Sequence, residues 1–291
     1  MGILACTAIV CLTTACGSDD DNNNQPHQTI SFVTPNTNGN IVKSIEYNGN
    51  FREAYNWDFS YSNGDLVSAS GVYRDSSENE FPYSAQILYK LNTININSTT
   101  SKPNATSSDI DRISTSDIVI GNNGFIQSMT IGQYEYSFEY NINGYLSRWE
   151  VIKSGTGLPG TNEIRKTYAN LNYNINGSLA EIIYTDNDAA PLNKCTVTFT
   201  YDTKPNINGL LPEGAIKELG FFGFEYLYYA GALGKSPLGY LLTSSHFDYS
   251  QEDGVNSDYT IYYTYAFSKN NDVKTCYFNY NSKYADVKYT Y

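Results

Sequence analysis

The chain is poor in histidine and in positive charge. It has 2 His and 18 Lys plus Arg among 291 residues, and charged residues make up only 16%, below the roughly 25% of an average soluble protein. A formal net charge of −12 excludes a nucleic-acid-binding function, which needs clustered Lys and Arg to neutralise phosphates. Outside the N-terminal region the single histidine is His246, and no G-x-S-x-G motif marks a nucleophile. We therefore predict no catalytic residue, no metal site and no cofactor.

Long apolar runs are almost absent, apart from ILACTAIVCLTTA at residues 3–15. This run is too short to cross a bilayer, which takes about 20 residues. It has the size of a signal-peptide core and ends in small residues. N-myristoylation is excluded because the sixth residue is Cys6 rather than Ser or Thr. The run therefore predicts a cleaved signal peptide at residues 1–15.

The end of this run, LTTAC, resembles a bacterial lipobox in which Cys16 would be the lipid acceptor. Thr14 and Ala15 are small, as the lipobox requires, whereas Thr13 departs from the usual Leu. The following GSDDD resembles the export signal of Bacteroidota surface lipoproteins. No Lys or Arg precedes Lys43, so the usual basic start of a signal peptide is missing. The resemblance implies a surface-exposed protein of the outer membrane that is attached to the membrane by lipid on Cys16. Two or more acyl chains on this residue would anchor the protein stably.

The residues after Cys16 are acidic and rich in Asn, which suits a hydrated tether. We therefore divide the chain into a signal peptide at 1–15, a lipidated tether at 16–39 and one β domain at 40–291. Two cysteines remain in this domain, Cys195 and Cys276, each in a strand-like run. A pair of buried thiols is favoured over a disulfide, because free Cys is a common core residue.

The β domain repeats one hairpin unit. An apolar-x-aromatic strand end is followed by a polar turn, a Gly and then a Leu or Ile that starts the next strand. The copies are FSYSNGDL (59–66), IVIGNNGFI (118–126), FEYNINGYL (138–146), LNYNINGSL (171–179) and FTYDTKPNINGLL (199–211). Asn and Gly tolerate the positive φ angles of tight hairpin turns. Strands such as QYEYSFEY alternate aromatic and polar residues, which indicates antiparallel strands with one face on a core.

We expect an all-β fold, an antiparallel up-and-down meander of a dozen or more strands that closes into a barrel or half-barrel. Two segments interrupt the pattern. Residues 92–116 are polar and predict a long loop. Residues 213–233 are rich in Leu, Phe and Tyr and predict one or two short helices that plug the sheet.

The hairpin copies, the segment before PLGYLLTS and the C-terminal YTIYYTYAFSKNNDVKTCYF together resemble a Bacteroidota domain family of unknown function with a porin-like β fold. The resemblance covers about residues 40–291. It implies the fold and a surface-lipoprotein setting, and it carries no catalytic residues.

Other motifs indicate little chemistry. GTGLPG at 155–160 matches the dinucleotide-binding letters, but another strand rather than a helix follows it. The acids of TDNDAA (185–190) and QEDGVNSD (251–258) are expected in solvated turns. Trp57, Trp149 and Tyr134 are the aromatic residues considered for ligand contact, although strand tryptophans more often belong to a core.

The leading hypothesis is a non-catalytic, lipid-anchored binding or structural module of the outer membrane that contacts a glycan or a protein. Two alternatives stay open. The first is a surface glycosidase that uses paired turn carboxylates, and the second is a small transmembrane β-barrel.

Overall fold

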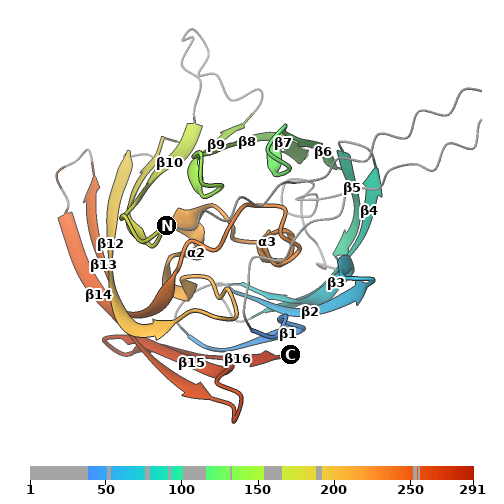
Figure 1. Cartoon of the computed structure of the whole chain (residues 1–291). Coiled ribbons are helices and arrows are strands. Elements are labelled where there is room, and N and C mark those ends of the chain that lie inside the picture. Colours follow the sequence, from blue (N-terminus) through green and yellow to red (C-terminus); the bar gives the residue numbers. More distant parts are fainter. Residues whose placement is uncertain are drawn as a thin grey trace, which may run out of the picture.

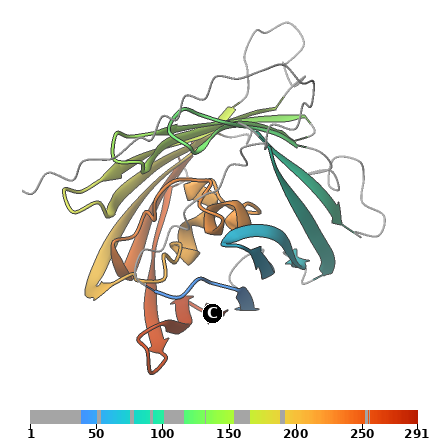
Figure 2. The same cartoon turned by 45° about the vertical axis from the view of Figure 1, so that its right-hand side comes forward.

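A computed structural model describes residues 39–50, 54–75, 79–90, 93–100, 116–131, 133–153, 166–187, 192–251, 254 and 256–291. The predicted signal peptide, Cys16 and nearly all of the predicted tether lie outside these residues, as does GTGLPG. Sixteen antiparallel strands form a closed barrel in which β1 pairs with β16. Figure 1 looks into this ring of strands, and Figure 2 shows it turned by 45°.

The strands follow one another around the ring in chain order. Their bounds are β1 (Ser44–Gly49), β2 (Ala54–Ser62), β3 (Asp65–Arg74), β4 (Glu80–Lys90), β5 (Thr93–Thr100), β6 (Ser116–Ile120), β7 (Ile126–Ile131), β8 (Tyr134–Tyr140), β9 (Leu146–Lys153), β10 (Lys166–Tyr173), β11 (Leu179–Asp186), β12 (Asn193–Pro205), β13 (Tyr240–Gln251), β14 (Asn256–Phe267), β15 (Val273–Tyr280) and β16 (Lys283–Thr290). The predicted all-β, up-and-down barrel is confirmed.

One end of the barrel carries the tight turns of the hairpin repeat. Because even-numbered strands all run toward this end, it holds the turns 63–64, 121–125, 141–145, 174–178 and 268–272. The beginning of β1 and the end of β16 lie there as well. We call it the turn end.

Five tyrosines, three of them in copies of the repeat, hold neighbouring hairpins together at the turn end. Each donates its hydroxyl to a backbone carbonyl near the start of the preceding strand, at 2.5 to 3.1 Å. These latch tyrosines, with their acceptors, are Tyr61 (Val42), Tyr89 (Leu66), Tyr140 (Ile126), Tyr201 (Leu179) and Tyr291 (Val273). Burial raises the pKa of all five phenols above the ordinary value. Each latch tyrosine therefore places its ring in the core and links two neighbouring hairpins through its hydroxyl.

The two faces of the barrel wall differ in polarity. Inward residues such as Trp57, Phe138 and Phe278 are buried. Outward residues include Ser, Thr and Asn, the exposed side chains of Leu88, Val119, Ile183, Tyr262, Tyr277 and Tyr284, and exposed charged side chains spread over the length of the strands. The charged residues include Glu46, Asp58, Glu135, Glu139, Lys194, Asp248, Asp258, Lys274 and Lys288. The apolar core therefore lies inside the barrel, and the charged residues of the wall strands lie outside.

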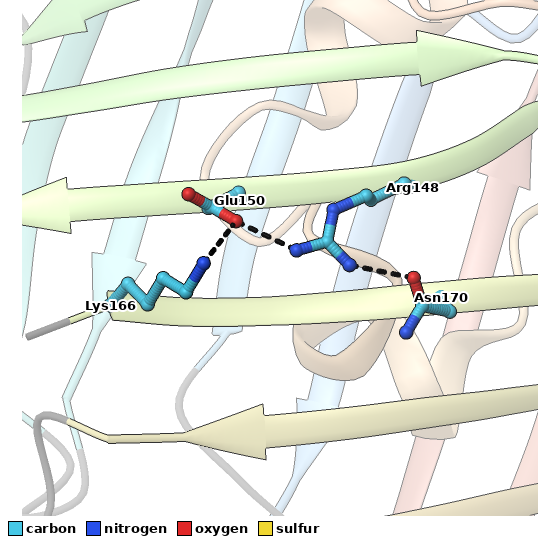
Figure 3. A network of polar contacts seen from close by, with 4 residues as sticks. All are labelled: Arg148, Glu150, Lys166 and Asn170. Carbon is cyan, nitrogen blue, oxygen red and sulfur yellow. Dashed lines mark hydrogen bonds and ion pairs between the residues drawn. The ribbon is translucent and has the colours of Figure 1, made fainter.

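A polar network on the outer wall shows this arrangement at close range (Figure 3). Glu150 Oε2 accepts hydrogen bonds from Arg148 at 2.7 Å and Lys166 at 3.1 Å, while Arg148 also donates to Asn170 at 2.7 Å. The Arg148 guanidinium lies 4.7 Å from the ring centre of Tyr168. Burial alone would raise the pKa of Glu150, but the bonds from Arg148 and Lys166 outweigh it and lower that pKa.

The interior is filled by the segment that connects β12 to β13. This plug, residues 206–239, contains a 3₁₀ turn η1 (Glu213–Ala215) and the helices α2 (Ile216–Leu219) and α3 (Glu225–Tyr229), which lie inside the ring in Figure 1. Tyr226 and Tyr228 are fully buried in it. The predicted helical insertion at 213–233 is confirmed, and the aromatic face of the sheet is a core around the plug.

The structure tests two further predictions, one about a loop and one about the two cysteines. The predicted loop at 92–116 is wrong in its first part, because Thr93–Thr100 forms β5, where Ile94 and Ile96 point inward and are completely buried. Only these two apolar residues alternate along the strand, and the Asn, Ser and Thr residues around them make the alternation hard to recognise in the sequence. The cysteines agree with the favoured prediction, since Cys195 and Cys276 are both buried and free.

Candidate functional site

The turn end presents two neighbouring copies of the sequence Asn-Ile-Asn-Gly. They form the turns 141–145, between β8 and β9, and 174–178, between β10 and β11. Because β9 pairs with β10, the two turns are adjacent on the rim. Gly144 and Gly177 have φ angles of 85° and 82°, which a residue with a Cβ rarely adopts.

Hydrogen bonds fix the shape of both turns. The Asn141 side-chain oxygen accepts from the backbone N–H of Asn143 at 3.0 Å and of Tyr145 at 3.1 Å. Asn174 does the same for Ser178 at 2.9 Å. These side-chain turns hold the backbone without help from the residue at the tip.

The residue at each tip is an isoleucine that points into solvent. Ile142 has a relative exposure of 103% and Ile175 of 108%. An exposed apolar side chain is common by itself, but here two are carried side by side on rigid turns. Both could have been found in the sequence, since Ile is the one apolar letter within each polar NING turn.

A pocket of about 510 Å³ lies between the two turns. It is lined by Asn141, Asn143, Tyr145, Tyr173, Asn174, Ile175, Asn176, Gly177 and Lys235. Tyr145 stacks on Tyr173 with ring centres 5.0 Å apart, and the Tyr145 hydroxyl would lie 2.5 Å from a Cβ at Gly177. Lys235, from the plug, donates its backbone N–H to Gly144 at 3.0 Å and places its ammonium 5.7 Å from the ring centre of Tyr145.

Positive charge gathers around this end. Its lysines are all exposed, and they are Lys43, Lys90, Lys204, Lys235 and Lys269. The acids of the same end are Asp65, Asp202, Asp272 and, one residue before the end of β8, Glu139. Burial opposes ionisation of Asp272, but hydrogen bonds from Asn208, Asn40 and Ser268 lower its pKa. The rim is therefore more basic than the chain as a whole, whose net charge is −12.

The described chain also begins at the turn end. The Asn40 side chain donates to Asp272 at 2.8 Å, and the Asn208 side chain donates to the Asn40 carbonyl at 3.2 Å. These contacts tie the start of the β domain to the turn 268–272 and to the first residues of the plug. Any segment that precedes residue 39 is therefore attached at the end that carries Ile142 and Ile175.

The aromatic residues considered for ligand contact do not gather at this site. Trp57 is 2% exposed and lies 5.3 Å from Tyr226 of the plug, measured between ring centres. Trp149 is 5% exposed and donates its indole N–H to the Glu218 carbonyl at 3.0 Å. Both tryptophans are buried core residues in this structure. Tyr134 is half-buried at the other end, with the Lys153 ammonium 5.8 Å from its ring centre.

Among the described residues, the interior holds three buried acids that no sequence pattern predicts there. Glu213, Glu218 and Glu225 all belong to the plug. Glu213 accepts a hydrogen bond from Tyr289 and Glu218 from Tyr249, each at 2.8 Å. Desolvation, together with the negative charge of Glu218, raises the pKa of Tyr249. These pairs join the plug to β13 and β16.

The described residues contain no group of three or more His, Cys, Asp or Glu side chains able to hold a metal ion. Asp186 and Asp258 lie in strands rather than in the expected turns, and Glu252 and Asp253 fall outside the described part. His246 is an exposed residue of β13, with its Nδ1 3.0 Å from Thr260 Oγ1. Within the same residues, no helix is long and apolar enough to cross a membrane.

Comparison with solved structures identifies related barrels. A porin-like protein from Bacteroides uniformis matches with a TM-score of 0.59 and 16% identity, over 86% of this chain and 97% of that one. The chain has a porin-like barrel fold. A porin-like protein from Bacteroides vulgatus matches with a TM-score of 0.49 and 13% identity, over 87% and 99%. No protein-family description and no curated protein matches the chain.

Proposed function

We propose that this porin-like barrel is a lipid-anchored, non-catalytic module of the outer membrane that stands in water on the cell surface. The observation that carries the proposal is the polarity of the wall, with aromatic residues inside and charged residues outside. A membrane-spanning barrel has the opposite arrangement, an apolar outer band about 25 Å tall around a polar interior.

Single charges on the wall support a barrel in water. Asp58 is exposed at the middle of β2, and Glu150 with its two cationic partners lies near the middle of β9. Charged residues at the bilayer midplane of a barrel cost about 2 to 4 kcal/mol for Arg or Lys, and less for acids. The plug adds a second argument, because a lumen packed with Leu, Phe and Tyr side chains offers no polar channel.

Attachment to the membrane rests on the lipobox-like sequence at Cys16. Lipid on this cysteine would hold the barrel at the outer membrane through the residues before Gly39. The acidic run after Cys16 supports surface exposure through its resemblance to an export signal.

The test compares wild-type protein with Cys16→Ala in a host that acylates bacterial lipoproteins. Wild type should take up labelled fatty acid and sediment with outer membranes. Cys16→Ala should lose the label and be recovered, folded, in detergent-free buffer. If Cys16→Ala stays in the membrane and needs detergent for extraction, the transmembrane-barrel alternative is favoured instead.

Glycan contact at the rim pocket is a second candidate activity. Four Asn side chains, a stacked Tyr pair and Lys235 line the pocket, and amides and aromatic rings suit hydroxyl-rich ligands. A glycan array probed with wild type and with a Lys235→Ala variant tests it. Binding that is lost in the variant supports the pocket, whereas a blank array leaves the structural role.

A further inference from the structure

We infer that the turn end of the barrel docks on an anionic bilayer surface, with Ile142 and Ile175 entering the lipid interface. The inference rests on the proposed anchoring of the chain. It adds an orientation to that proposal, because it places one defined end of the barrel against the membrane.

The two isoleucine tips have no part in the fold. Their exposures of 103% and 108% mean that neither side chain packs against the barrel, while Asn141 and Asn174 hold the turns by themselves. A pair of apolar side chains displayed on stiff, adjacent turns can enter a membrane interface with little loss of conformational freedom. Burying one such side chain strengthens partition by at least about tenfold.

The charges around the tips favour anionic headgroups. Five exposed lysines surround the turn end, and one of the three aspartates there, Asp272, is buried among Asn40, Asn208 and Ser268. Exposed acids such as Asp248 and Asp258 lie toward the opposite end, together with the exposed Lys194 and Lys283, whereas the exposed Glu139 lies next to the turn end. A negatively charged surface would attract the lysines of the turn end.

The path of the chain supports a membrane as the occupant of this surface. The β domain starts at the turn end, where Asn40 is fixed to Asp272, so a lipid on Cys16 would lie on the same side. The residues between Cys16 and Gly39 could extend to about 80 Å. Such a tether alone would leave the barrel free to rotate, whereas contact through the tips would orient it.

Tryptophan at the tips gives a direct test in the full lipidated chain. Ile142→Trp and Ile175→Trp would be reconstituted in vesicles of phosphatidylcholine with phosphatidylglycerol, some of whose acyl chains carry bromine. The native Trp57 and Trp149 are buried in the core, so they supply a constant, unquenched background. Tyr262→Trp is the matched control, because Tyr262 is 61% exposed on the outer wall of β14.

Docking predicts that bromine quenches the tip tryptophans at least about twofold more than the Tyr262→Trp control. Adding Lys90→Glu and Lys269→Glu, or replacing phosphatidylglycerol by phosphatidylcholine, should reduce this difference. Equal quenching at the tips and at the control, with the protein still floating on the vesicles, would overturn docking and leave the anchor intact. Protein that does not float would overturn the proposed function and docking together.

Two further outcomes would assign the turn end to another partner. A tip tryptophan that shifts to the blue without lipid, as the concentration of the chain rises, would assign the surface to a second copy. A tip that responds to soluble oligosaccharides but not to brominated lipid would assign it to a glycan. Either result would overturn docking on the bilayer.

Discussion

Replacing each latch tyrosine by phenylalanine tests how the hairpins of this barrel are joined. The change removes one hydroxyl and leaves the ring in the core. In Tyr140→Phe the Ile126 carbonyl loses a donor at 2.9 Å, and in Tyr89→Phe the Leu66 carbonyl loses one at 2.7 Å. A hydrogen bond contributes about 1 kcal/mol net, and a buried partner left unsatisfied costs about 1 to 3 kcal/mol. We expect each variant to be destabilised by about 1 to 2 kcal/mol.

Tyr173 is the matched control within the same repeat. It occupies the aromatic position of LNYNINGSL, but its buried hydroxyl has no hydrogen-bond partner among the described residues. Tyr173→Phe should therefore leave stability unchanged or raise it slightly, because an unsatisfied polar group is removed.

Thermal unfolding measures the difference. For a domain of this size, 1 kcal/mol corresponds to a change in Tm of about 2 to 4 °C. Tyr89→Phe and Tyr140→Phe should each lower Tm by several degrees, and their effects should add, since the two latches are on separate hairpins. If Tyr173→Phe lowers Tm as much as either of them, the latch bonds do not stabilise the barrel and the reasoning is wrong.

Three other predictions concern the plug and the core. Gly220→Ala should destabilise the protein by more than Gly64→Ala, because both glycines have positive φ but only a Cβ at Gly220 would meet the Trp149 ring, at 2.6 Å; urea titrations of the two variants compare them. The stability contributed by the buried tyrosines should be constant below about pH 10 and fall at higher pH, since burial raises the pKa of the core tyrosines, such as Tyr226 and the latches, so that the unfolded chain ionises first. The slope is about 1.4 kcal/mol per pH unit for each such tyrosine, and phenolate absorbance before unfolding beyond that of the exposed tyrosines, such as Tyr262, would contradict it. Cys195 and Cys276 should not react with a thiol reagent until the protein is denatured, because both side chains are buried and burial raises the pKa of Cys195 to about 12. Fast labelling of either cysteine in the native protein would show that its thiol is accessible and would contradict the prediction.

The hairpin repeat was predictable because its information is local. Asn and Gly at fixed positions specify each turn, and the aromatic residue at or next to the strand end marks the inward face. Residues 93–100 were not recognised as a strand, because only Ile94 and Ile96 carry the inward pattern there. The same locality explains why the closure of the barrel was left open, since the pairing of β1 with β16 joins residues more than 230 positions apart, as in Ser44 and Thr290.

The candidate site was harder to predict than the fold. Trp57 and Trp149 attract attention in a sequence with two tryptophans, yet their size makes them the natural contacts for a plug. Ile142 and Ile175 looked like ordinary apolar residues, and only the turn geometry shows that nothing covers them. Glu213 bonds to Tyr289, 76 positions away, and Glu218 bonds to Tyr249, 31 positions away. No local sequence pattern predicts hydrogen bonds over such separations.

The plug and the polar outer wall follow from one property of the strands. Because side chains alternate along a strand, shifting the pattern by one residue would exchange the inner and outer faces. Placing the aromatic residues inside gives a wall that suits water, but it also creates a wide apolar lumen. About eight strands enclose a space that their own side chains can fill, and this barrel has sixteen. A lumen of that width needs apolar material from elsewhere, and the insertion between β12 and β13 supplies it with Leu219, Tyr226 and Leu227. A barrel of this size with inward aromatic residues therefore requires a plug, and a variant that lacks the plug should not form the closed barrel.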